Sequence, residues 1–295
     1  MEQGIKLAVI TAIISGFSIF ASKLFVSTMD PIVFTTLKNF LVAGVLSIGL
    51  IGSPFRKQLI TLTKKQWIQL LLIGLIGGGI PFALFFTGLA MTTAVQGAII
   101  QKTLFIWVAI MAYWYLRERL NKWQMLGYAT VTFGALWLSN FKIFTIGKGE
   151  FMILAATLLW SVEHLIAKKA LYDISSEIVA WARMTFGVVI LITLLVVQGK
   201  VQMALTLNTS QLTAVLIGGG LLTGYVLTWY KALSKAPATM VSLVLASSPV
   251  VTSALSAIFI TKTMPAMPDI VTMIALTGGV IVAILYNDQK ELATV

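Results

Sequence analysis

LLWSVEHLIAKKAL, residues 158–171, combines an apolar run with an acidic residue, Glu163, and with the only histidine of the chain, His164. Lys168 and Lys169 follow near its end. An apolar run of this kind is typical of a transmembrane helix, and charged residues inside such a helix are costly unless they are paired or hydrated. The stretch therefore predicts a membrane-spanning helix that carries functional groups.

The composition of the chain is that of a membrane protein. Of its 295 residues, 58% are hydrophobic and 11% are charged, and the mean hydropathy is +0.96. Soluble domains are about half apolar and about a quarter charged. The N-terminal apolar run is one of many, so we expect a first span there and not a cleaved signal peptide. The lack of cysteine excludes disulfides, thiolate metal sites and cysteine nucleophiles.

Ten apolar runs are long enough to cross a bilayer. A bilayer core about 30 Å thick needs roughly 20 apolar residues per helix. The runs predict helices at 4–27, 32–52, 67–90, 94–116, 123–141, 150–171, 176–198, 211–233, 236–260 and 270–286. The connections are short and contain turn formers such as Pro31 and Pro265, which leaves no room for a soluble domain. The expected fold class is an all-α integral membrane protein with ten transmembrane helices.

The basic residues indicate how these helices are oriented. Thirteen Lys and Arg residues collect on one side of the membrane, whereas the opposite loops hold only Lys142, Lys148, Lys200 and Lys262. Basic loops stay in the cytoplasm, so we expect both termini there, in the inner or plasma membrane of a bacterium or archaeon. This bias also accounts for the net charge of +11, and no nucleic-acid partner is expected.

The two halves of the chain contain a weak internal repeat. Offsets of 145 and 144 residues align the pairs Lys38/Arg183, Ser18/Glu163, Gly74/Gly218 and Phe86/Tyr230. Each half, 1–145 and 146–295, then holds five predicted spans. An odd number of spans inserts the second half from the opposite side of the membrane, and inverted repeats of this kind are typical of secondary transporters.

Several short motifs resemble the drug/metabolite transporter superfamily, EamA type. The junction of the fourth and fifth spans reads Tyr115-Leu116-Arg117-Glu118-Arg119-Leu120 and is followed by Gly127 and Gly134, which is similar to a signature of that family. In the second half, Ser248-Pro249-Val250 resembles the family's proline-containing helix. The sequence departs from the pattern at Lys262 and Phe105, which stand where the family has glutamate and proline.

This resemblance implies a ten-helix carrier made of two inverted five-helix EamA-like repeats, with a central cavity near a pseudo-twofold axis. Members of the family export or exchange small metabolites, including amino acids, sugar phosphates and nucleotide sugars, and they hydrolyse nothing. The resemblance thus implies a transporter and no enzyme.

Two ionisable residues lie at equal depth in the hairpin of the sixth and seventh spans. Glu163 precedes Asp173, the centre of the turn, by ten residues, and Arg183 follows it by ten. Both lie about 10 Å inside the cytoplasmic end, so we expect an ion pair. The alternative is that Glu163 takes up and releases a coupling proton. His164 points about 100° away, toward the face of Trp160, and is expected to be a hydrogen-bonded interface residue.

Two lysines lie in the outer half of the membrane, where the first five spans offer no carboxylate at similar depth. Lys38 lies about 9 Å and Lys102 about 12 Å inside the outer ends of their spans. Lys38 either extends to the surface or faces a cavity, and Lys102 is expected to face a water-filled cavity. An unpaired lysine attracts a carboxylate or phosphate. With Asn39, Gln101 and Trp160, these lysines form the predicted substrate site.

Glycine and proline residues occur at corresponding places in the third and eighth spans. The third span contains Gly78 and Pro81, and the eighth contains Gly219. Such residues mark either substrate sites and moving helices or close helix packing. Together with Tyr230, which could form an aromatic constriction, and Pro249 of the ninth span, they are the predicted gating residues.

Other functional classes fit the sequence less well. A membrane metalloprotease needs two histidines at helical spacing, and a channel needs a ring of like residues. The predicted function is a secondary active transporter, an exporter or exchanger of small polar or zwitterionic metabolites such as amino acids, which works by alternating access. The alternative is an antiporter of sugar phosphates or other organic anions. We expect no cofactor or metal, and the expected partners are a small-molecule substrate, the lipid bilayer and protons as coupling ion, in a monomer or dimer.

Overall fold

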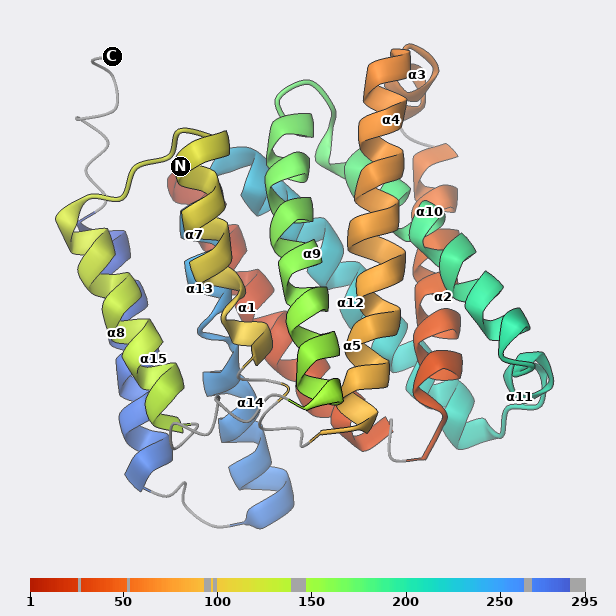
Figure 1. Cartoon of the computed structure of the whole chain (residues 1–295). Coiled ribbons are helices and arrows are strands. Elements are labelled where there is room, and N and C mark those ends of the chain that lie inside the picture. The colour runs from red at the N-terminus through yellow and green to blue at the C-terminus, as the bar shows by residue number, and fades with distance from the viewer. Residues whose placement is uncertain are drawn as a thin grey trace.

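Long helices run from one end of the molecule to the other (Figure 1). The computed structural model describes residues 1–25, 28–51, 54–92, 97, 100–138, 147–262 and 267–286, and every regular element among them is a helix. The helices are α1 (Glu2–Phe25), α2 (Pro31–Ile51), α3 (Phe55–Ile60), α4 (Lys64–Ile73), the π-helix η1 (Gly74–Gly79), α5 (Ile80–Ala90), α7 (Leu104–Tyr115), α8 (Lys122–Leu138), α9 (Lys148–Ala170), α10 (Ser176–Val197), α11 (Val201–Leu205), α12 (Thr209–Lys235), α13 (Ala238–Leu245), α14 (Ser248–Ser256), the π-helix η3 (Ala257–Thr261) and α15 (Met267–Leu285).

Seven helical segments are long and apolar enough to cross a membrane, judged by length and composition. They are Glu2–Ser22, Pro31–Ile51, Lys64–Leu89, Lys148–Ala170, Ser176–Val197, Thr209–Lys235 and Ala238–Ile260. The shorter helices α7, α8 and α15 take the places of the remaining predicted spans, so the helix order is consistent with ten. The all-helical membrane fold is confirmed.

Where the structure describes the ends of the predicted spans, these lie within three residues of the observed helix ends. Some predicted positions lie outside the described part of the chain. They are the span ends at 26–27, 52, 94–96, 98–99 and 139–141, the repeat boundary at 145–146, and the loop residues Lys142 and Pro265.

The packing of the helices follows the internal repeat. The second span packs on the seventh (α2 on α10), the fourth on the ninth (α7 on α13) and the fifth on the tenth (α8 on α15). The first span packs on the eighth (α1 on α12), and the equivalent pair of sixth and third spans (α9 on α5) packs likewise. Figure 1 shows that α1 and its repeat counterpart α9 run in opposite directions. The two repeats are therefore inverted.

Two spans are broken at repeat-related positions. The fourth span turns at Thr103, before α7, and the ninth turns at Ala246 and Ser247, between α13 and α14. Thr103 and Ser247 are 144 residues apart, which is one of the two offsets of the repeat. Neither break was predicted from the sequence, although Pro249 marks the start of α14.

The third span changes from an α-helix to the π-helix η1, and Pro81 then lies in the first turn of α5. Proline has no N–H group, so the carbonyl four residues earlier, that of Gly77, loses its usual helical donor. The eighth span is different, because α12 continues through Gly218 and Gly219 without a break. The glycines of the eighth span therefore do not interrupt its helix in this structure.

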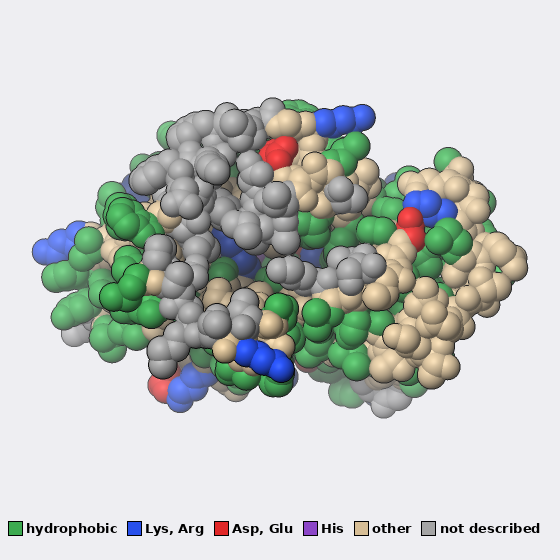
Figure 2. Space-filling view, turned by 90° about the horizontal axis from the view of Figure 1, so that it is seen from below, with side chains coloured by type: hydrophobic (Ala, Val, Ile, Leu, Met, Phe, Trp, Pro, Cys, Tyr) green, Lys and Arg blue, Asp and Glu red, His purple; other side chains and the backbone are tan. Residues whose placement is uncertain are grey.

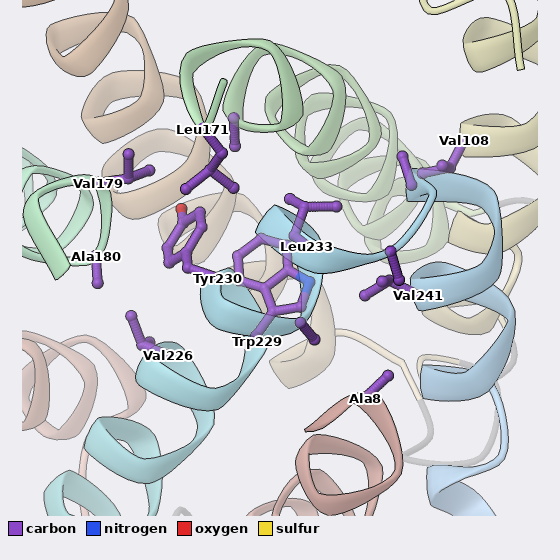
Figure 3. Packing of buried hydrophobic residues seen from close by; sticks show 14 of the residues in the cluster. Ala8, Val108, Leu171, Val179, Ala180, Val226, Trp229, Tyr230, Leu233 and Val241 are labelled. Atoms are coloured by element: carbon purple, nitrogen blue, oxygen red, sulfur yellow. The ribbon is translucent and has the colours of Figure 1, made fainter. Parts of the chain in front are cut away.

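The largest apolar core lies in the half of the bundle that contains Met1. Its members come from the N-terminal half of α1, the C-terminal halves of α2, α9 and α12, and from α4, α7, α8, α10, α13 and α15. Figure 3 shows Trp229 and Tyr230 projecting from α12 into this core beside Leu233. This half of the bundle is closely packed, which leaves the opposite half for a cavity.

Candidate functional site

A cavity of about 460 Å³ lies between the two repeats. It is lined by α1, α2, α5 and the start of α7 from the first repeat, and by α9, α10, α12 and α13 from the second. Ser22 and Leu89, near the last turns of α1 and α5, belong to its wall, so the cavity extends toward the end opposite Met1. Figure 2 views that end and shows basic side chains in a hollow near its centre.

Among the residues that the structure describes, the cavity wall contains one lysine, Lys38, and one arginine, Arg183. Each is only 4% exposed, and they occupy equivalent positions of the repeat. Lys38 Nζ lies 4.9 Å from the ring centre of Phe34 and 5.4 Å from that of Phe86. Among the described residues it has no hydrogen bond or ion pair. Lys38 was expected either to extend to the surface or to face a cavity, and in the structure it faces the cavity.

Arg183 lies between aromatic rings and a backbone carbonyl. Its Cζ atom is 5.7 Å from the ring centre of Phe82 and 4.9 Å from that of Trp229, and Nη2 donates to the carbonyl of Gly77 over 3.2 Å. The atoms Nε and Nη1 have no hydrogen-bond partner among the described residues. The guanidinium therefore keeps donor capacity for a further acceptor.

Glu163 is fully buried behind the cavity wall. Its Oε1 accepts a hydrogen bond of 2.6 Å from the Tyr230 hydroxyl, and its Oε2 has no partner within the described chain. A Cβ atom added to Gly77 would lie 2.8 Å from Glu163 Cδ and 3.2 Å from Arg183 Nε, so the two charged groups flank this glycine. They nevertheless form no ion pair within 4.0 Å. The predicted direct ion pair is therefore wrong for this structure, in which Glu163 Oε1 accepts from Tyr230 and Arg183 Nη2 donates to the Gly77 carbonyl instead.

Trp160 and His164 line the cavity from α9. Trp160 Nε1 donates to the Gly77 carbonyl over 3.0 Å, and its ring packs against Phe82 at 5.5 Å between ring centres. His164 Nε2 lies 3.2 Å from the carbonyl oxygen of Ala238. A carbonyl only accepts, so this nitrogen carries the proton. His164 thus lies at the interface of α9 with α13.

Uncharged polar side chains also belong to the wall. Ser15, Ser18 and Ser22 of α1 are spaced by three and four residues, which places them on one face of the helix. No hydrogen bond of their hydroxyl groups occurs among the described residues, nor any of the Gln101 side chain, which was predicted as a site residue. The place of the three serines in the cavity wall was not predicted from the sequence. Their helical spacing in an apolar span is nevertheless a signal that the sequence contains.

Lys102 and Asn39 lie outside the cavity wall. Lys102 Nζ donates to the hydroxyl of Ser248 over 2.7 Å, at the start of α14. The expectation of an unpaired Lys102 in a cavity is therefore wrong for this structure, because the break in the ninth span brings a hydroxyl group within reach. Asn39 is fully buried, and its Nδ2 donates to the carbonyl of Thr35 in the same helix.

The predicted gating glycines are packing positions in this structure. A Cβ atom at Gly78 would collide with the carbonyl oxygen of Arg183, so glycine is needed where η1 crosses α10. A Cβ atom at Gly219 would meet Leu41 at 2.5 Å, inside the unbroken α12. Both positions allow neighbouring helices to approach closely.

At the end of the bundle that contains Met1, hydrogen bonds join the first repeat to the start of α13, and we call this group of hydrogen bonds the latch. Glu118 accepts from the N–H groups of Ala238 and Thr239 over 2.9 Å and 3.0 Å, and from the Thr239 hydroxyl over 2.8 Å. Tyr128 donates to the Thr239 carbonyl over 2.8 Å. A carboxylate at a helix N-terminus is stabilised by the free N–H groups and by the helix dipole.

The sequence was also compared with known proteins. The EamA-like transporter family matches residues 2–140 and again residues 147–285. An uncharacterized transporter of Methanothermobacter thermautotrophicus is 27% identical over 55% of this chain, and the match spans about half, 52%, of that protein. The uncharacterized transporter YoaV of Bacillus subtilis is 22% identical over 81% of this chain and 82% of its own length.

One solved crystal structure has the same fold, with a TM-score of 0.75 at 15% identity over 97% of this chain and 98% of that one. The two family matches cover nearly the whole chain, and each coincides with one of the two repeats. The chain belongs to the EamA-like transporter family.

Proposed function

We propose that this membrane transporter is a secondary active carrier that moves a small metabolite with an anionic group by alternating access. The observation that carries the proposal is the cavity between the repeats, with Lys38 and Arg183 in its wall. Cavities of about 300–1,000 Å³ with apolar walls and a few polar groups are typical of small-molecule sites, and carriers with inverted repeats bind substrate between them.

Two features support alternating access. The cavity extends toward one end of the bundle, and the latch of Glu118, Tyr128, Ala238 and Thr239 closes the other. Movement of one repeat against the other would break the latch and close the opposite end. If the two repeats exchanged their arrangements, the carrier would reach a second conformation of similar construction.

Glu163 is the candidate for coupling transport to protons. Its carboxylate is buried, one oxygen has no partner among the described residues, and Arg183 of the cavity wall lies beside it. A proton taken up by Glu163 would change the charge next to Arg183 and hence the attraction of that arginine for an anion. Substrate and proton would thus compete through one arginine.

The charge bias supports a cytoplasmic location of both termini. We propose in addition that the protein resides in the inner or plasma membrane of a bacterium or archaeon and, by its resemblance to metabolite exporters, that net transport is outward. The substrate class includes amino acids, other organic acids and sugar phosphates, since each carries a carboxylate or phosphate. The carrier would act as a monomer or dimer without a cofactor.

The test is efflux from proteoliposomes loaded with a mixture of amino acids, aromatic organic acids and sugar phosphates, with each compound followed by mass spectrometry. We expect saturable efflux of one class, accelerated by the same compound outside and reduced by Lys38→Met but not by Lys57→Met, which changes an exposed lysine. Efflux equal to that from protein-free liposomes for every compound, or unitary currents, would contradict the proposal.

A further inference from the structure

The Lys, Arg, Asp and Glu side chains in the described cavity wall are all positively charged. Lys38 and Arg183 belong to this wall, whereas no Asp or Glu does so among the described residues. The two nearby carboxylates do not belong to the wall, and each has at least one oxygen bound to another group, while Glu163 Oε2 has no partner among the described residues. Glu163 accepts from Tyr230, and Glu150 contacts the Thr92 hydroxyl and accepts from the N–H of Gly147 at the start of α9.

From this arrangement we propose that the cavity accepts an aromatic organic anion without an ammonium group, such as an aromatic hydroxy acid, in preference to the corresponding amino acid. The inference rests on the proposed transport function and narrows its substrate class. It assigns the carboxylate to Lys38 and Arg183, the aromatic ring to the cavity's ring-lined wall, and the hydroxyl group to α1.

The cations of the wall lack the acceptors that a carboxylate would supply. Lys38 Nζ is near only the faces of Phe34 and Phe86 in the described chain. Arg183 Nε and Nη1 and the indole N–H of Trp229 have no hydrogen-bond partner there, and the two side chains are in contact. Buried donors without acceptors are unfavourable, so a ligand that brings acceptor oxygens gains from each of them.

An ammonium group has no matching position. It would lie in a wall that carries two cations and no carboxylate, and like charges repel strongly away from bulk water. Replacing the ammonium of an amino acid by a hydroxyl removes this repulsion. It also provides a group that can exchange hydrogen bonds with Ser15, Ser18 and Ser22, whose hydroxyls have no partner among the described residues.

Aromatic rings from both repeats supply surfaces for a flat apolar body. Phe85 packs at 5.2 Å from Phe86 and at 5.4 Å from Trp160, measured between ring centres. On the other side, Tyr225 and Trp229 are stacked at 5.9 Å with an angle of 24° between their planes. Aromatic groups interact favourably at such distances in stacked and edge-to-face arrangements, so an aryl group is favoured over a polyhydroxylated one.

The experiment measures counterflow of labelled 3-phenyllactate in proteoliposomes, with four unlabelled competitors. Three of them change one group: phenylalanine exchanges the hydroxyl for an ammonium group, 3-phenylpropanoate has no hydroxyl, and lactate has no ring. The fourth, 2-phenylethylamine, has no carboxylate and carries an ammonium group in place of the hydroxyl. We expect phenylalanine and lactate to need at least tenfold higher concentrations than phenyllactate for half inhibition, 3-phenylpropanoate to fall between, and the amine not to compete.

Variants assign the effect to the cavity. Lys38→Met should raise the half-saturating concentration of phenyllactate at least tenfold. Lys38→Arg, which keeps the positive charge, should retain most of the affinity. Lys102→Met, the matched lysine outside the wall, should change it less than threefold. If Lys38→Met does not fold, the competitor series on the unchanged protein decides.

Two results would overturn the inference. The first is stronger competition by phenylalanine than by phenyllactate, and the second is no saturable counterflow of phenyllactate at all. Either result leaves the transport function standing if the loaded mixture still shows saturable efflux of another compound. If that efflux is also absent, the proposed function fails as well.

Discussion

Replacing Glu118 with glutamine should open the latch and shift the carrier toward the conformation that faces the end of Met1. The carboxylate accepts three hydrogen bonds, two of them from N–H groups in the first turn of α13. Hydrogen bonds to charged groups contribute about 1.5–3 kcal/mol each when buried. Glu118 is only partly buried and glutamine retains one acceptor oxygen, so we take a loss of about 1–2 kcal/mol. At about 1.4 kcal/mol per factor of ten, the population open to that end should rise about 5-fold to 30-fold.

The lack of cysteine makes sided labelling a direct assay. Leu245→Cys introduces one thiol into the cavity wall, and a membrane-impermeant maleimide is applied from the side of the termini. Labelling should be slow with Glu118 present and about 5-fold to 30-fold faster in Glu118→Gln. Glu177→Gln is the matched control, because its carboxylate pairs with Lys231 at 3.8 Å and takes no part in the latch. Equal labelling rates with and without the Glu118 carboxylate would show that the latch does not hold this end closed.

Three further outcomes are expected. Glu163→Gln should keep substrate exchange but lose the pH dependence of net transport in proteoliposomes, and an unchanged pH profile would eliminate the proton role. Gly78→Ala should lower the free energy of unfolding of the purified protein by about 1–3 kcal/mol or more, because the added Cβ atom meets a backbone carbonyl of α10. Gly220→Ala is the control and should be neutral, because the space around Gly220 is open. Equal stabilities of the two variants would refute the close-packing role of Gly78. Burial alone would raise the pKa of the Asp30 carboxyl, but hydrogen bonds from Lys200 and from N–H groups of α2 hold that pKa below its usual value. The ionised Asp30 carboxylate therefore stabilises the fold above about pH 4, and this stabilisation is lost as the pH falls through the lowered pKa. The melting temperature of Asp30→Asn should accordingly fall less between pH 6 and pH 3 than that of the unchanged protein. Equal pH profiles of the two proteins would count against the ion pair.

Features that depend on local composition could be predicted from the sequence. Helix positions follow from apolar length, and the repeat offset of 145 residues placed Lys38 and Arg183 at equivalent positions. Both indeed lie in the wall of one cavity. Composition and periodicity succeed here because lipid imposes one length on every span and the duplication imposes one arrangement on both halves.

Features that depend on distant partners could not be predicted. Depth in the membrane was a poor guide for Lys102, because depth does not say which neighbour lies beside a side chain, and the break near Ser248 supplied a partner. The same holds for Glu163, whose carboxylate contacts Tyr230 instead of Arg183. Glu118 was found only as part of a motif, since nothing in the local sequence points to the start of α13 about 120 residues away.

The repeat is not exact at the position of Glu163, and this has a consequence for the energy of the resting states. If two identical halves formed the carrier, its two conformations would be related by the twofold axis between the halves and would be equally populated. Ser18, however, occupies the place equivalent to Glu163. When the halves exchange roles, a hydroxyl stands where a buried carboxylate stood. In a carrier that works by alternating access, as proposed, this divergence would favour one side of the membrane even in the absence of any ion gradient.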